Sequence, residues 1–131
     1  MKIRHVLSMT VLTLLTGFAY AGLVQPAPVV VDLDNRVALG DQFTARTAMN
    51  ETVFIGCGSR TIDDGVNPFR FGFCQARDSE GDFIFCSTQN ADLLDEMRAL
   101  TAYAFITFSW NENDECIRVG SSTQSFYLPK K

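Results

Sequence analysis

Residues 69–87 read FRFGFCQARDSEGDFIFCS, with phenylalanine at every second position in the two runs that flank a polar centre. A period of two is typical of β-strands, because successive side chains point to opposite faces of a sheet. Between the runs, Asp78-Ser79-Glu80-Gly81 has the composition of a turn. The sequence therefore predicts a β-hairpin with a three-residue turn at Ser79 to Gly81.

The predicted turn also fixes the register of the hairpin. One face then carries four phenylalanines: Phe71, Phe73, Phe83 and Phe85. Cys74 lies opposite Cys86 on the other face. A shift by one residue would mix these two sets, so the hydrophobic pattern favours this register.

The chain contains four cysteines: Cys57, Cys74, Cys86 and Cys116. An even number of cysteines in a small exported chain is typical of a disulfide framework. Three pairings are possible; the hairpin register favours Cys74 with Cys86, which leaves Cys57 with Cys116. No CxxC motif is present, which argues against a four-thiolate zinc site and against a thiol redox protein.

The first 21 residues have the pattern of a secretory signal peptide. Lys2 and Arg4 give a positive start, residues 6–16 are apolar, and Ala19-Tyr20-Ala21 is a cleavage pattern. The apolar run is too short to span a bilayer. We therefore expect a periplasmic or secreted protein that begins near Gly22 and is not inserted in a membrane after cleavage.

Cleavage of the signal peptide excludes several kinds of catalytic site and metal site. The only histidine, His5, leaves with the signal peptide, so Ser-His-Asp and Cys-His hydrolases and the common zinc sites are excluded. The whole chain has a formal net charge of −4, which disfavours nucleic acid as a partner. No cofactor is expected.

The rest of the mature chain has mostly strand patterns. Strands are expected at residues 29–33, 43–47, 51–55, 103–110, 116–119 and 126–128, with a long polar loop at 59–68. Within 103–110, the side chains of Ala104, Ile106, Phe108 and Trp110 should share one face.

One segment has a helical period. Asn90 is suited to an N-cap, and the apolar stripe of the helix consists of Leu93, Leu94, Met97 and Leu100. We expect an amphipathic helix at 91–101 that packs on a sheet.

These elements define the expected organisation: a flexible leader at 22–28 and a single β-rich domain at 29–131. The fold class is mainly β with an α+β tendency. We expect a small antiparallel sheet sandwich or barrel-like domain with one helix, stabilised by disulfides.

Two groups of residues are candidate binding sites. Aromatic side chains suited to ligand binding are Tyr103, Phe105, Trp110 and Tyr127. Alternating acidic residues that could bind calcium are Asp78, Glu80 and Asp82. Solvated turn residues are the simpler interpretation of the acidic group, since the loop lacks the pattern of a twelve-residue calcium hand.

The sequence favours a binding or structural protein of the cell envelope or the extracellular medium, with an unknown protein or carbohydrate ligand. Because no catalytic set is evident, a non-enzymatic function is favoured over an enzyme. The alternative is a glycosidase-like hydrolase that uses two carboxylates, with candidates Asp63, Asp64, Glu112 and Glu115. A contiguous exposed aromatic patch would favour binding, and a polar cleft would favour the enzyme.

Overall fold

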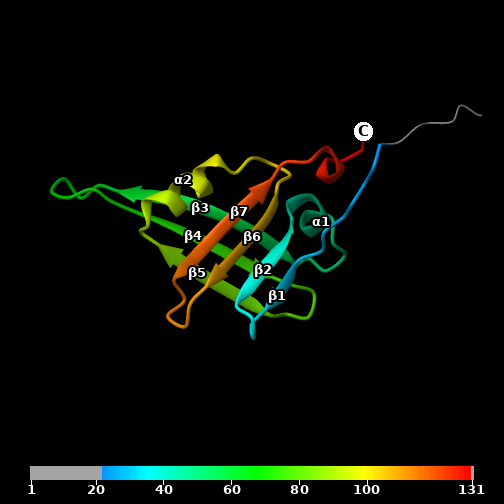
Figure 1. Cartoon of the computed structure of the whole chain (residues 1–131), viewed down its shortest axis with the longest axis horizontal. Helices are drawn as coiled ribbons and strands as arrows, with labels where there is room; N and C mark the ends of the chain where they lie inside the picture. The colour runs from blue at the N-terminus through cyan, green and yellow to red at the C-terminus, as the bar shows by residue number, and fades with distance from the viewer. Residues whose placement is uncertain (1–21, 131) are drawn as a thin grey trace, which may run out of the picture.

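The computed structural model describes residues 22–130, so the predicted signal peptide lies outside the described residues. Two antiparallel sheets form the fold (Figure 1). The four-stranded sheet has the order β1-β2-β6-β7, formed by Val30–Asp32, Val37–Asp41, Phe105–Trp110 and Cys116–Ser122. The three-stranded sheet has the order β3-β4-β5, formed by Phe54–Ile62, Phe69–Arg77 and Phe83–Thr88. The helical elements are α1 (Gln42–Arg46), α2 (Ala91–Ala99) and the 3-10 turn η1 (Ser125–Tyr127).

The two sheets face each other around one core, and in Figure 1 the strands of one sheet run across those of the other. The face of β6 that Ile106 and Phe108 share is buried, and both side chains are fully covered. The other sheet contributes inward positions of β4 and β5, including Ala76 and Ile84. The predicted mainly β sandwich with an amphipathic helix and disulfides is therefore confirmed.

The hairpin of β4 and β5 has the predicted register, with Cys74 opposite Cys86. Asp78 donates its backbone N–H to the carbonyl of Asp82 at 3.1 Å and closes the turn. Gly81 has a φ of 99°, a left-handed conformation that glycine adopts without a steric cost. The turn chemistry and the period of two were enough to predict this element.

Helix α2 begins where the sequence predicts and ends at Ala99, two residues earlier than expected. The side chain of Asn90 accepts hydrogen bonds from the backbone N–H groups of Asp92 and Leu93. Leu94 and Met97 are buried on the sheet above Gly72 of β4, where a Cβ would collide with both side chains. Gly72 therefore sets how closely the helix approaches the sheet.

The expected strand at 43–47 was wrong, because this segment is helix α1. The carboxylate of Asp41 accepts the N–H of Thr44 at 2.7 Å and caps the helix. Asp41 also ends β2, a strand that the sequence analysis missed. A capping aspartate directly after an apolar run was the available signal.

Further boundaries differ from the expectation: β3 begins at Phe54 and not at residue 51, and β6 begins at Phe105 and not at residue 103. The segment predicted to close the sheet at 126–128 belongs instead to the end of the chain around η1. The polar half of β3 continues to Ile62, and only residues 63–68 form a loop. Pairing with the phenylalanine-rich half of β4 holds these polar residues in a strand.

The segment 22–28 has no regular secondary structure, and hydrogen bonds attach it to the domain at two places. Gln25 donates its N–H to the carbonyl of Phe126. Ala27 donates to the carboxylate of Asp41 at 2.6 Å, and its carbonyl accepts from the N–H of Asp41 at 2.8 Å. Within residues 22–130, no helix is long and apolar enough to cross a membrane.

Candidate binding surface

The structure separates the four aromatic residues that the sequence analysis proposed for ligand binding. Trp110 lies in the core, only 5% exposed, and its ring contacts Phe108. Phe105 and Tyr127 stack on each other with ring centroids 5.6 Å apart. Tyr103 instead meets another aromatic ring edge-on, that of Phe43. Only one pair of the four is therefore brought together.

A larger aromatic surface covers the outward side of the three-stranded sheet. We define the phenylalanine face by the six phenylalanines at outward positions of these strands: Phe54, Phe69, Phe71, Phe73, Phe83 and Phe85. Three of them, Phe69, Phe83 and Phe85, are 43–45% exposed. The sequence predicts that four of the six share one face of the hairpin, but it does not identify that face as a site.

The rings of the phenylalanine face contact one another across and along the strands. Phe73 stacks on Phe85 of the next strand with centroids 5.8 Å apart. Phe69, Phe71 and Phe73 form a ladder along β4 with centroid distances of 5.6 and 6.2 Å. This packing holds the rings in place without removing them from solvent.

Two arginines complete this surface. The guanidinium of Arg60 lies 5.5 Å from the ring centroid of Phe73, and that of Arg77 lies 5.3 Å from Phe83. Both distances are within the range of cation–π attraction. The outward positions of β3, β4 and β5 carry no carboxylate, so the charge on the phenylalanine face is positive.

The phenylalanine face contains a hollow whose lining includes Phe73. The ring of Phe73 lies over Gly58, 3.2 Å from where a Cβ would stand, while nothing lies within 4 Å of that position at Gly56. A cavity of about 290 Å³ opens here. Its lining consists of Arg60, Phe71, Phe73, Gln75 and Phe85.

The residues proposed for calcium binding surround the β4–β5 turn, and one of them has a structural role. The Oδ1 atom of Asp78 accepts the N–H groups of Glu80, Gly81 and Asp82, each at 3.0 Å. Its Oδ2 accepts the N–H of Val31 in the other sheet at 3.2 Å. Both oxygens of the Asp78 carboxylate therefore accept hydrogen bonds from backbone N–H groups. These bonds hold the turn against β1.

Carboxylates surround that turn, but they do not converge on a common point. A hollow of about 580 Å³ is lined by carboxylates from the end of β1, the β1–β2 turn and the β4–β5 turn: Asp32, Asp34, Asp78, Glu80 and Asp82. Among the described residues, the only group with three ligand atoms within 4.8 Å of one another is a cysteine cluster. No three carboxylates of the acidic hollow therefore lie within 4.8 Å of one another in the structure.

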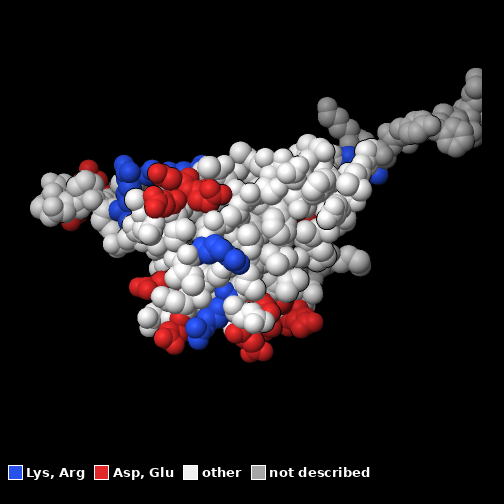
Figure 2. Space-filling view, in the orientation of Figure 1, with Lys and Arg blue, Asp and Glu red and all other residues white. Residues whose placement is uncertain are grey.

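The carboxylates considered for hydrolysis lie in two separate loops. Asp63 and Asp64 belong to the β3–β4 loop, and Glu112 and Glu115 to the β6–β7 turn. Figure 2 shows acidic side chains at both places, the tip of the projecting hairpin and the lower edge of the molecule. Backbone N–H groups of Asn67 and Val66 hold the pKa of Asp64 below its ordinary value, the opposite of what a general acid requires.

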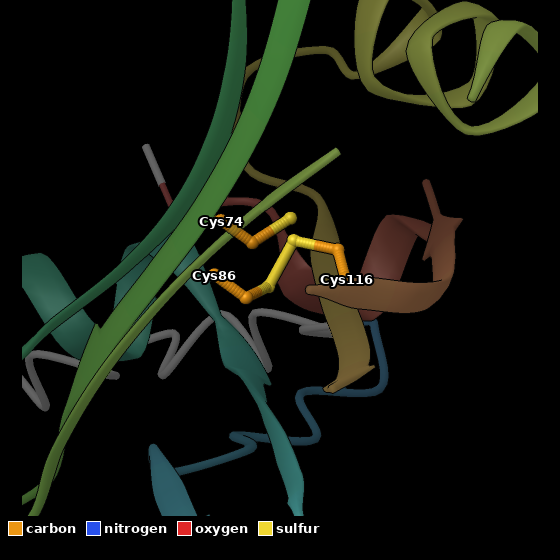
Figure 3. Close-up of side chains that lie close together, drawn as sticks. All are labelled: Cys74, Cys86 and Cys116. Carbon is orange, nitrogen blue, oxygen red and sulfur yellow. A yellow bond between two sulfur atoms is a disulfide. The ribbon is translucent and has the colours of Figure 1, made fainter. Parts of the chain in front are cut away.

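The disulfides differ from the favoured pairing. Cys57 is bonded to Cys74, and Cys86 to Cys116. The register places Cys74 of the central strand opposite both Cys57 and Cys86, so the hairpin alone could not choose its partner. Figure 3 shows the sulfurs of Cys74, Cys86 and Cys116 side by side, all within 4.8 Å of one another. All four cysteines are engaged in disulfides, as the cysteine count predicts.

These observations define the class: a disulfide-stabilised protein of two antiparallel sheets, one of which presents an aromatic outer face. Disulfides of this kind are typical of oxidising compartments. In comparisons with known proteins, no family model, curated protein or solved structure matches the chain.

Proposed function

We propose that this chain is an exported binding protein, periplasmic or secreted, and that the phenylalanine face binds a protein partner. The observation that carries the proposal is the contiguous set of exposed rings on a solvent-facing sheet. Exposed apolar patches are costly on monomers and commonly mark interaction sites. The predicted signal peptide and the two disulfides support export.

The composition of the face favours protein over carbohydrate. Aromatic residues and arginine are enriched at the centres of protein interfaces. Sugar hydroxyls buried against phenylalanine rings would lack hydrogen-bond partners, and this costs free energy. The neutral polar side chains at the outward positions are few, with Gln75 on β4 and Ser87 on β5. The partner that fits has apolar side chains at its centre and carboxylates placed to meet Arg60 and Arg77.

Site-specific photocrosslinking tests this proposal. Phe85 is replaced by the photoreactive analogue benzoylphenylalanine in the exporting host, and the matched control carries it in place of Ile117, which is 59% exposed on β7. Irradiation should give a discrete protein adduct from position 85 and none from position 117. Adding Arg60→Glu should weaken the adduct, since it reverses the charge beside the rings.

Two results would refute the proposal. One is the absence of any protein adduct from position 85. The other is the same adduct from both positions, because a partner that binds the phenylalanine face does not contact β7 of the opposite sheet.

A further inference from the structure

The outer edge of β3 has no neighbouring strand among residues 22–130, although both α1 and α2 contact this strand. β3 pairs only with β4, and the Cα atoms of Cys57 and Cys74 are 4.0 Å apart. So short a distance identifies a non-hydrogen-bonded pair, whose N–H and C=O groups point away from the neighbouring strand. By the alternation of the ladder, the same holds for Ser59 and Thr61. Within residues 22–130, no backbone hydrogen bond satisfies these groups.

The strand itself lacks four features that commonly prevent pairing. Natural proteins protect edge strands with proline, lysine, bulges or short length. β3 has nine residues, contains neither proline nor lysine, and pairs in unbroken register with β4. Its one charged residue, Arg60, is directed to the phenylalanine face and not along the edge. The edge is therefore a template for a further strand.

The distal half of β3 projects from the molecule as part of a two-stranded ribbon (Figure 1). Two strands without a third layer are marginally stable in water. The ribbon nevertheless carries large exposed apolar side chains near its tip: Ile62 (49%), Val66 (78%) and Phe69 (43%). A partner that covered this tip would bury apolar area and extend the two-stranded ribbon into a wider sheet.

A hollow that could receive such a tip lies at the other end of the same strand. Its volume is about 430 Å³, and its lining is largely apolar. The side chains around it include Val53, Phe54 and Ile55 at the start of β3, together with Ala45 and Tyr103. One strand thus presents an apolar tip at one end and an apolar hollow at the other.

We propose that two copies of this chain pair through antiparallel β3 edges, with Ser59 opposite the partner's Ser59. The free N–H and C=O groups of residues 57, 59 and 61 then meet their equivalents around a two-fold axis. In this register Ile62 stands over the partner's Gly56, where a side chain has open space. The hairpin tip with Val66 continues toward the partner's hollow.

The dimer is a six-stranded sheet in which the two phenylalanine faces lie on one side. Because Arg60 of each copy approaches the partner's Arg60 diagonally across the pair, added salt should strengthen this dimer. Pairing with an acidic partner would be weakened by salt. The dimer does not depend on the proposed binding role, since it forms through the edge of β3 and does not use Phe71, Phe73, Phe83 or Phe85.

Sedimentation of the exported chain tests the dimer, with Ser59→Pro as the diagnostic variant and Ser59→Ala as its matched control. Proline removes an N–H that points away from β4, so the ladder within the sheet keeps its hydrogen bonds. The wild-type chain and Ser59→Ala should form dimers, and Ser59→Pro should raise the dissociation constant at least about tenfold through two lost hydrogen bonds. Val66→Asp should also weaken the dimer, whereas Leu33→Asp, at an exposed β1–β2 turn, should not.

Amide hydrogen exchange gives a readout that does not depend on a variant. The N–H groups of Cys57, Ser59 and Thr61 should become protected as the protein concentration rises. A chain that stays monomeric up to millimolar concentration would overturn the proposal. So would a dimer that survives Ser59→Pro and Val66→Asp but is lost in Phe85→Ser, because that dimer forms through the phenylalanine face.

Discussion

Asp78 joins the two sheets through its side chain. Its carboxylate holds the β4–β5 turn through three N–H groups and joins the opposite sheet through Val31. Asp78→Ala should lower the free energy of unfolding by about 2–3 kcal/mol, because hydrogen bonds to a buried carboxylate are lost. Denaturant unfolding measures this loss. Asp82→Ala, an exposed neighbour in the same turn, should change it by less than about 0.5 kcal/mol; equal losses in both variants would contradict the role of Asp78.

The cysteine cluster gives a second prediction at this scale. Cys57→Ala leaves Cys74 as a thiol whose sulfur lies within 4.8 Å of both sulfurs of the remaining disulfide. Thiolate attack on that disulfide would exchange partners without large movement of the chain. Alkylation and peptide mapping should find the free thiol distributed among Cys74, Cys86 and Cys116. A thiol confined to Cys74 would show that the exchange does not occur.

Among the elements, α2 depends on the absence of one side chain in the sheet beneath it. Gly72→Ala places a Cβ against Met97 and 2.9 Å from a methyl carbon of Leu94. The free energy of unfolding should fall by about 1–3 kcal/mol, the usual cost of overpacking. Gly120→Ala on β7 is the control, since its Cβ meets only Thr107 at 3.4 Å. Thermal unfolding of both variants tests the claim, which fails if they melt together.

Elements whose local pattern agreed with their surroundings could be predicted from the sequence. The β4–β5 hairpin and α2 carry their own period, turn and cap. The polar half of β3 has no such signal, since it is a strand only because it pairs with β4. The favoured disulfide pairing was wrong for the same reason, because the sequence does not show that β3 pairs with β4 and places Cys57 opposite Cys74. Trp110 is buried and Phe85 is exposed because only one side of each sheet meets the core. The local sequence does not show which side that is.

For the whole molecule, the inner faces of the two sheets and the outer face of the three-stranded sheet have different roles. The inner faces and the disulfides form a core that fixes the strands. The outer face of the three-stranded sheet carries rings and arginines that the core does not need. The period of two could predict that four phenylalanines share a face. It could not predict that this face points to solvent, because that depends on the position of the second sheet.

Hydroxyl-radical footprinting tests the central claim, that the phenylalanine face is an exposed surface which a partner covers. The protein is labelled once after purification and once in the exported fraction that contains its partners. Phe83 and Phe85 should be oxidised in the purified protein and protected in the exported fraction, with Ile117 labelled equally in both. Equal labelling of these two phenylalanines in both samples, or their protection in the purified protein, would contradict the account.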